Sequence, residues 1–171
     1  MPTIKILRAG SLGILLALIS ISANASTATN TFLVQITLTA SCAVSASTLN
    51  FGSSVGVLTT AVSNTTTVSV TCSNTTPYNV GLDAGTVSGS LVANRLMAGT
   101  TAGNTGTTLQ FQLCSDGTAC NTVWGNTVGT NTVSGTGTGA AQALTVYGKV
   151  PIQTTPKPDL YQTTITATVT Y

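Results

Sequence analysis

The sequence lacks histidine and glutamate, and it carries few charges of either sign. Its 171 residues include five basic side chains and three acidic ones, and all three acidic residues are aspartates. General acid–base and nucleophilic catalysis usually depend on a histidine or on paired carboxylates. A Ser-Lys dyad using Lys149 or Lys157 is the arrangement formally left, and the abundance of serine makes such a pair a coincidence. The composition therefore predicts a protein that is not an enzyme and needs no cofactor.

Residues 1–25 have the composition of a secretory signal peptide. Lys5 and Arg8 precede an apolar run at residues 12–21 that is too short to span a membrane, and the small residues Ala23 and Ala25 mark a cleavage site. An N-terminal membrane anchor is the alternative, and the polar stretch after the run disfavours it. Removal of this peptide leaves a chain long enough for one domain with a single core.

The mature chain has a formal charge of zero, because three basic and three acidic side chains remain. They are Arg95, Lys149 and Lys157, and Asp83, Asp116 and Asp159. Nothing in this balance would attract phosphates, so nucleic-acid binding is not expected. A surface rich in Thr, Ser, Asn and Gly and poor in charge is unusual for a soluble monomer and favours a protein that associates.

The four cysteines of an exported chain are predicted to form two disulfides. Sequence alone allows three pairings, and the alternation of the flanking strands narrows them. Cys42 and Cys72 share the inner face of their strands, whereas Cys114 falls on the outer face. We predict Cys42–Cys72 across the core and Cys114–Cys120 at the surface, where it would clasp a hairpin turn at Asp116. No CxxC pair or histidine accompanies the cysteines, so no metal site is expected.

Residues 31–44, TFLVQITLTASCAV, predict a β-strand with one apolar face. Phe32, Val34, Ile36 and Leu38 alternate with polar residues, and Leu33 alone breaks the pattern. Such a strand must lie against a sheet, which belongs either to its own chain or to another copy. The alternation by itself leaves both outcomes open.

Short strands and turn signals fill the rest of the chain, and helical periodicity appears nowhere after the signal peptide. This pattern is typical of an all-β sandwich. The expected strands lie at residues 55–58, 66–72, 78–83, 91–97, 107–114, 122–124, 144–150 and 165–171. The NTV repeat within residues 121–141 is read as a loop, and Gly148 is expected to mark a bulge or a close approach of another segment.

The last strand, residues 165–171, alternates cleanly and is followed by no further strand. Ile165, Ala167, Val169 and Tyr171 share its apolar face. A regular, uncharged, uncovered edge of this kind is prone to pair with another chain. Together with the opening strand, it predicts either a self-completed sandwich or a polymer joined by β-strand addition.

The order of several short motifs resembles the spore coat protein U domain family, which includes subunits of archaic chaperone-usher pili. The matching motifs are SCAV at residues 41–44, LNFG at 49–52, VSVTCS at 68–73, LQFQLCSDGTACNTVWG at 109–125, YGKVP at 147–151 and the ending PDLYQTTITATVTY. Cys42 and Cys72 match the family's disulfide positions. Cys114 and Cys120 look like an addition, so the second pairing depends on strand parity alone.

The resemblance implies an incomplete immunoglobulin-like sandwich at residues 41–171, completed by a donor strand from a neighbouring subunit. Residues 26–40 would be that donor strand, and the partners would be other copies or related subunits, a periplasmic chaperone and an outer-membrane usher at the cell surface. The implied donor residues are Phe32, Val34, Ile36 and Leu38, and the implied acceptor residues are Ile165, Ala167, Val169 and Tyr171. The predicted function is a structural fibre subunit with a role in adhesion or biofilm formation.

The alternative is a secreted, self-completed coat or carbohydrate-binding adhesin domain. Trp124 and Tyr78 would then supply aromatic platforms for a sugar, although they are more typical of a core or its rim.

Overall fold

The structure, a computed structural model, describes residues 24–53 and 56–171. The predicted signal peptide lies outside the described residues except for its last two positions, and so does Val55 of the strand expected at residues 55–58. The chain divides into two units, residues 1–37 and 38–171. No helix in the described ranges is long and apolar enough to cross a membrane.

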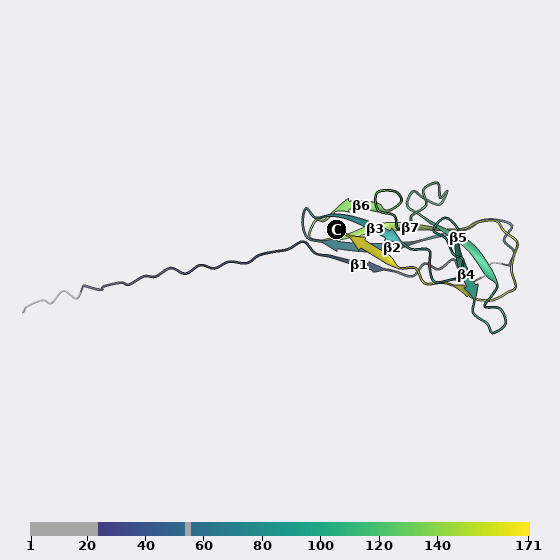
Figure 1. Cartoon of the computed structure of the whole chain (residues 1–171), viewed down its shortest axis with the longest axis horizontal. Helices are drawn as coiled ribbons and strands as arrows, with labels where there is room; N and C mark the ends of the chain where they lie inside the picture. Colours follow the sequence, from purple (N-terminus) through teal and green to yellow (C-terminus); the bar gives the residue numbers. More distant parts are fainter. Residues whose placement is uncertain (1–23, 54–55) are drawn as a thin grey trace, which may run out of the picture. The chain divides into compact units, whose positions relative to one another are not determined.

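The second unit is an antiparallel β-structure of two sheets, and the all-β prediction is confirmed (Figure 1). The larger sheet has the order β1-β2-β7-β5-β4-β8, and the smaller has the order β6-β3-β9. The strands are β1 (Cys42–Ala46), β2 (Val62–Cys72), β3 (Pro77–Leu82), β4 (Arg95–Gly99), β5 (Thr108–Cys114), β6 (Val133–Thr136), β7 (Ala141–Val150), β8 (Tyr161–Gln162) and β9 (Ala167–Thr170).

The core lies between the inner faces of the two sheets. Val70 from β2 and Val80 from β3 are both fully buried, whereas Ser69, Thr71 and Asn79 beside them in the sequence are more exposed. Tyr78 and Trp124 are also buried, and the indole Nε1 of Trp124 donates a hydrogen bond to the Val80 carbonyl at 2.8 Å. Neither aromatic side chain is therefore available as a surface platform for a sugar.

Both predicted disulfides are present, but the surroundings of each differ from expectation. Cys42 and Cys72 are direct partners in the β1–β2 ladder, with Cα atoms 4.1 Å apart, so the bond joins neighbouring strands and does not cross the core. Cys114 is fully buried and not at the surface. Residues 115–124 fold back onto it, with the disulfide to Cys120 and a β-bridge between Cys114 and Val123, while Gln110 on the same face of β5 stays exposed.

Strand boundaries also correct several expectations. The repeat region read as a loop contains β6, residues 122–124 form a bridge and no strand, and β4 begins at Arg95 instead of residue 91. Residues 56–58 form no strand, although Leu58 is buried. Short strands that pair on one side only show little apolar–polar alternation. Where they begin and end therefore depends on the neighbouring strand with which they pair.

Gly148 on β7 marks a close approach, as its place on the inner face predicted. A side chain there would collide with Leu49 and would come within 2.8 Å of the Phe51 ring. Phe51 in turn packs edge-on against Phe111, with ring centroids 6.3 Å apart. The absent side chain thus lets the segment after β1 fold onto the inner face of the larger sheet.

Loop length predicts that the two disulfides differ in their contribution to stability. The bonds span 30 and 6 residues, and loop-closure entropy then gives about 3.6 and about 2.2 kcal/mol. We expect C42A/C72A to lower the free energy of unfolding in urea by roughly 1.4 kcal/mol more than C114A/C120A does. Equal losses, or a larger loss for the second pair, would contradict this ranking.

Candidate binding groove

The N-terminal segment carries its apolar side chains in the open. Residues 24–41 have no assigned secondary structure, so the strand expected from residue 31 begins only at Cys42. The exposed fractions of the four predicted donor side chains are 86% for Phe32, 79% for Val34, 84% for Ile36 and 85% for Leu38. A β-strand is stabilised by a partner that accepts and donates its main-chain hydrogen bonds, and this segment has none in the described chain.

The second unit contains an open groove of about 1050 Å³. One side is formed by residues 46–52, which follow β1. The other side is the outer wall, residues 161–167, which leads into β9, together with a proline-containing strap at residues 155–160. The floor is apolar and includes Val68, Leu82, Met97, Leu109, Phe111, Leu113, Val146 and Val150.

Each side of the groove continues a strand at the edge of its sheet. β1 ends the larger sheet and β9 ends the smaller one. The hydrogen bonds from Ser73 N to Ser41 O and from Ser47 N to Thr67 O show that odd-numbered residues of β1 face β2. Main-chain groups alternate in direction along a strand, so those of Cys42 and Val44 face away from β2. This edge belongs to no ladder among the described strands.

The predicted acceptor residues are placed differently from one another. Ile165 and Ala167 line the groove, Val169 packs against the core beside it, and Tyr171 is 59% exposed and lies outside the lining. Sequence reasoning missed the strap and the opposite side. No pattern in residues 155–160 indicates that they border a groove.

Asp159 anchors the strap to the loop after β4. Its carboxylate accepts hydrogen bonds from Asn104 Nδ2 at 2.7 Å, from Thr101 N at 3.0 Å and from Thr101 Oγ1 at 2.8 Å. The bond from the Asn104 amide is the largest cause holding the pKa of the Asp159 carboxyl below its usual range, followed by the Thr101 main-chain bond. Gly99 leaves the space for this cluster, since a Cβ there would lie 2.8 Å from the Asp159 carboxylate.

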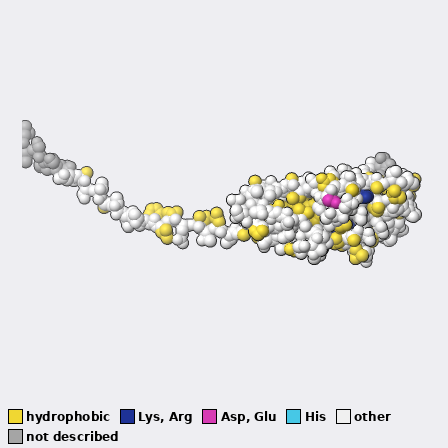
Figure 2. All heavy atoms as spheres, turned by 90° about the horizontal axis from the view of Figure 1, so that it is seen from above, with side chains coloured by type: hydrophobic (Ala, Val, Ile, Leu, Met, Phe, Trp, Pro, Cys, Tyr) yellow, Lys and Arg dark blue, Asp and Glu magenta, His cyan; other side chains and the backbone are white. Residues whose placement is uncertain are grey.

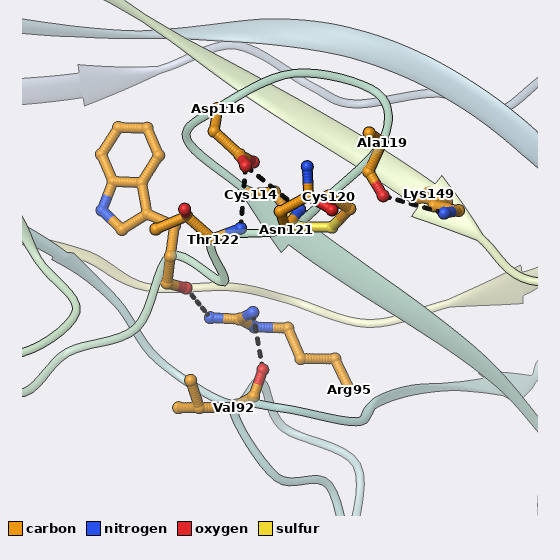
Figure 3. The surroundings of a disulfide bond; sticks show 10 residues. Val92, Arg95, Cys114, Asp116, Ala119, Cys120, Asn121, Thr122 and Lys149 are labelled. Atoms are coloured by element: carbon orange, nitrogen blue, oxygen red, sulfur yellow. Dashed lines mark hydrogen bonds between the residues drawn. A yellow bond between two sulfur atoms is a disulfide. The ribbon is translucent and has the colours of Figure 1, made fainter.

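Arg95 is fully buried, and its guanidinium donates only to main-chain carbonyls, one of them that of the groove residue Leu82. The acceptors are the carbonyls of Asp83 at 2.7 Å, Val92 at 2.9 Å, Leu82 at 2.9 Å and Trp124 at 2.7 Å. Figure 3 shows the bonds to Val92 and to the tryptophan. Burial lowers the pKa of Arg95 to about 10, while the negative charge of Asp83 raises it. The side chain therefore stays charged at neutral pH.

The loop closed by Cys114–Cys120 positions Trp124 for this contact. The Asp116 carboxylate accepts hydrogen bonds from the main-chain N–H groups of Asn121 and Thr122, and Lys149 Nζ donates to the Ala119 carbonyl at 3.0 Å (Figure 3). Figure 2 shows a face of the molecule on which acidic and basic side chains are few. The groove can thus bind an uncharged, apolar, extended segment, since its floor is apolar.

These features define a class of protein, an antiparallel β-sandwich with an apolar groove between two sheet edges. The Spore Coat Protein U domain model matches residues 28–168, and the chain belongs to this family.

Among solved structures, the chain resembles one in the CsuC–CsuE chaperone–tip adhesion subunit pre-assembly complex from archaic chaperone-usher Csu pili of Acinetobacter baumannii. The TM-score is 0.54 at 23% identity, covering 79% of this chain and 40% of that one. The likeness supports the immunoglobulin-like fold, and this chain spans less than half of its counterpart's length. No curated protein matches the sequence.

Removing the Arg95 guanidinium should strongly destabilise the domain. Arg95→Met keeps the apolar stem but leaves buried carbonyls without a donor, at roughly 1–3 kcal/mol each. We expect the free energy of unfolding to fall by about 3 kcal/mol or more. Lys149→Met, which removes one carbonyl contact at the surface, should cost less than about 1 kcal/mol. Similar urea midpoints for the two variants would refute this role for Arg95.

Stability should depend on pH through Asp159. Its pKa is depressed in the folded chain, so its contribution is present above the unfolded pKa of about 3.9 and is lost as the pH falls toward the folded value. We expect wild type to have a higher urea midpoint than Asp159→Asn at pH 6, and the difference to shrink below about pH 4. A difference that is the same at both pH values would rule this out.

Proposed function

We propose that this protein is a structural subunit of a surface fibre of the archaic chaperone-usher kind. In this proposal, residues 26–40 of one copy occupy the groove of the next, and the fibre grows by repeating that contact. The observation that carries the proposal is the match between two parts of one chain: an exposed segment with alternating apolar side chains and an apolar groove bordered by free sheet edges.

The dimensions of segment and groove agree. The outer wall from Tyr161 to Ala167 has as many residues as the segment from Phe32 to Leu38, and both would extend about 20 Å as strands. A strand in the groove would place alternate side chains on the apolar floor, and its main chain would pair with the edges. Burying four exposed apolar side chains would contribute roughly 6–12 kcal/mol before ordering costs.

The N-terminal segment and the groove floor are both uncharged. Residues 26–41 contain no charged side chain, and the groove floor is apolar, so no buried charge opposes the contact. Lys157 and Asp159 stand at the strap, on the rim. An exposed groove of this kind needs cover before assembly, which is the role of the periplasmic chaperone. An outer-membrane usher would then exchange the chaperone for the next subunit, with the finished fibre serving adhesion or biofilm formation at the cell surface.

The fibre proposal is tested by one inward-facing and one outward-facing substitution. We expect Ile36→Asp to abolish fibres, because it places a charge in the dry groove, and its neighbour Thr37→Asp to leave them intact. The chain is expressed with its chaperone and usher, and sheared surface fractions are compared by gel electrophoresis with and without boiling. Wild type and Thr37→Asp should give ladders that collapse to one band on heating, whereas Ile36→Asp should accumulate as periplasmic monomer.

Two results would count against this function. A normal ladder from Ile36→Asp would mean that residues 26–40 do not form the contact between subunits. A single monomer band from wild type in both lanes would favour a self-completed coat or carbohydrate-binding domain.

A further inference from the structure

The hydrogen-bond pattern between β3 and β9 changes where the groove begins. The last regular pair is Leu82 with Ala167. One residue further, Asp83 N donates to Thr166 O at 3.1 Å, as an antiparallel pair would. The reciprocal bond is replaced, since Thr166 N donates at 2.9 Å to the side-chain oxygen Oδ1 of Asp83.

The replacement follows from the buried arginine. The Asp83 carbonyl, which would normally accept from Thr166, accepts instead from Arg95 Nε at 2.7 Å. The Asp83 carboxylate then accepts the hydrogen bond from Thr166 N in place of the carbonyl. It also accepts from Gly85 N at 3.0 Å, where a φ of +90° turns the chain away from the ladder.

The bond from Asp83 N to Thr166 O keeps the outer wall at ladder distance here, and the Asp83 carboxylate holds the N–H of Thr166. Beyond Thr166 the wall is held by hydroxyl groups: Thr86 N donates to Thr163 Oγ1 at 3.3 Å, and Thr164 N donates to Thr86 Oγ1 at 3.4 Å. These wall residues border the groove, whose floor there includes Leu82. Side-chain bonds thus hold the outer wall in place where the regular ladder ends.

We propose that Asp83 is a positioning residue for strand binding, acting through Thr166 on the wall of the groove. Thr166 directs its N–H and C=O toward Asp83, so the main-chain groups of Ile165 and Ala167 face the other way, toward an incoming strand. The bond from Thr166 N to the Asp83 carboxylate holds the peptide groups of Ile165 and Ala167 in the orientation that an incoming strand needs. Without this bond, those peptide groups can rotate, and ordering them on binding costs free energy. The inference rests on the proposed function, and the occupant is residues 26–40 of a second copy.

The test measures peptide affinity separately from stability. The mature chain carries Ile36→Asp, which disables its own segment, and receives a fluorescent peptide with the sequence of residues 26–40. Asp83→Ala is compared with Asp116→Ala, a matched control that also removes a carboxylate accepting two main-chain N–H groups, but away from the groove. Fluorescence anisotropy gives the Kd, and urea denaturation gives the free energy of unfolding.

We expect Asp83→Ala to lose more stability than Asp116→Ala, because it also removes the negative charge beside the buried Arg95. Asp83→Ala alone should bind the peptide about tenfold more weakly, the change that about 1.4 kcal/mol produces. Asp83→Asn should stay within about threefold of its parent, because its side-chain oxygen still accepts both N–H groups. Asp83→Glu keeps the charge on a longer side chain and should weaken binding by at least about threefold, which tests the spacing even if Asp83→Ala does not fold.

Equal affinity of the Asp83→Ala and Asp116→Ala chains, or unchanged affinity of Asp83→Glu, would overturn the inference. If the parent chain binds no peptide at all, the proposed function fails and the role of Asp83 fails with it. The two failures are therefore distinguished by the parent measurement.

Discussion

Main-chain N–H and C=O groups at the edge of a sheet need hydrogen-bond partners, and this domain has two such edges beside one apolar groove. β1 and β9 each pair on one side only. The floor between their extensions is built from residues that would be the core of a closed sandwich. The same chain carries an exposed segment with the complementary alternation. Unmet backbone bonding and unburied apolar surface together favour association over a closed monomer.

The few charged groups are used for positioning rather than for ion pairing. Each of the three aspartates accepts hydrogen bonds from main-chain N–H groups: Asp83 from the wall, Asp116 from the disulfide loop and Asp159 from the loop after β4. Arg95 donates to carbonyls alone. A charged group bonded in this way holds several irregular backbone segments at once, which a regular ladder cannot do. The acceptor side of the groove is therefore defined by polar contacts, although its floor is apolar.

Alternation in the sequence predicted the long strands well, because residues such as Val68 and Val146 must face a core for the pattern to arise. It failed at β6, where Gly135 lies against the buried Tyr78 ring and a repeat typical of loops pairs with β3. Parity placed Cys114 on the outer face correctly, yet could not show that a loop would cover it. Arg95 carried no signal, since a lone arginine in a sequence is usually a surface residue.

Local composition determined the strand faces, the two pairs of cysteines, the alternating N-terminal segment and the exclusion of histidine- or glutamate-based catalysis, because each depends on residue type and spacing alone. Only the tertiary structure decided that β1 lies at a sheet edge, that the strap borders a groove, and that the carboxylate of Asp83 replaces its own carbonyl at Thr166. Those features depend on segments far apart in the chain. The hydrogen bond from Arg95 to the Asp83 carbonyl forms only when the fold brings the two residues together, and no periodicity in the sequence indicates it.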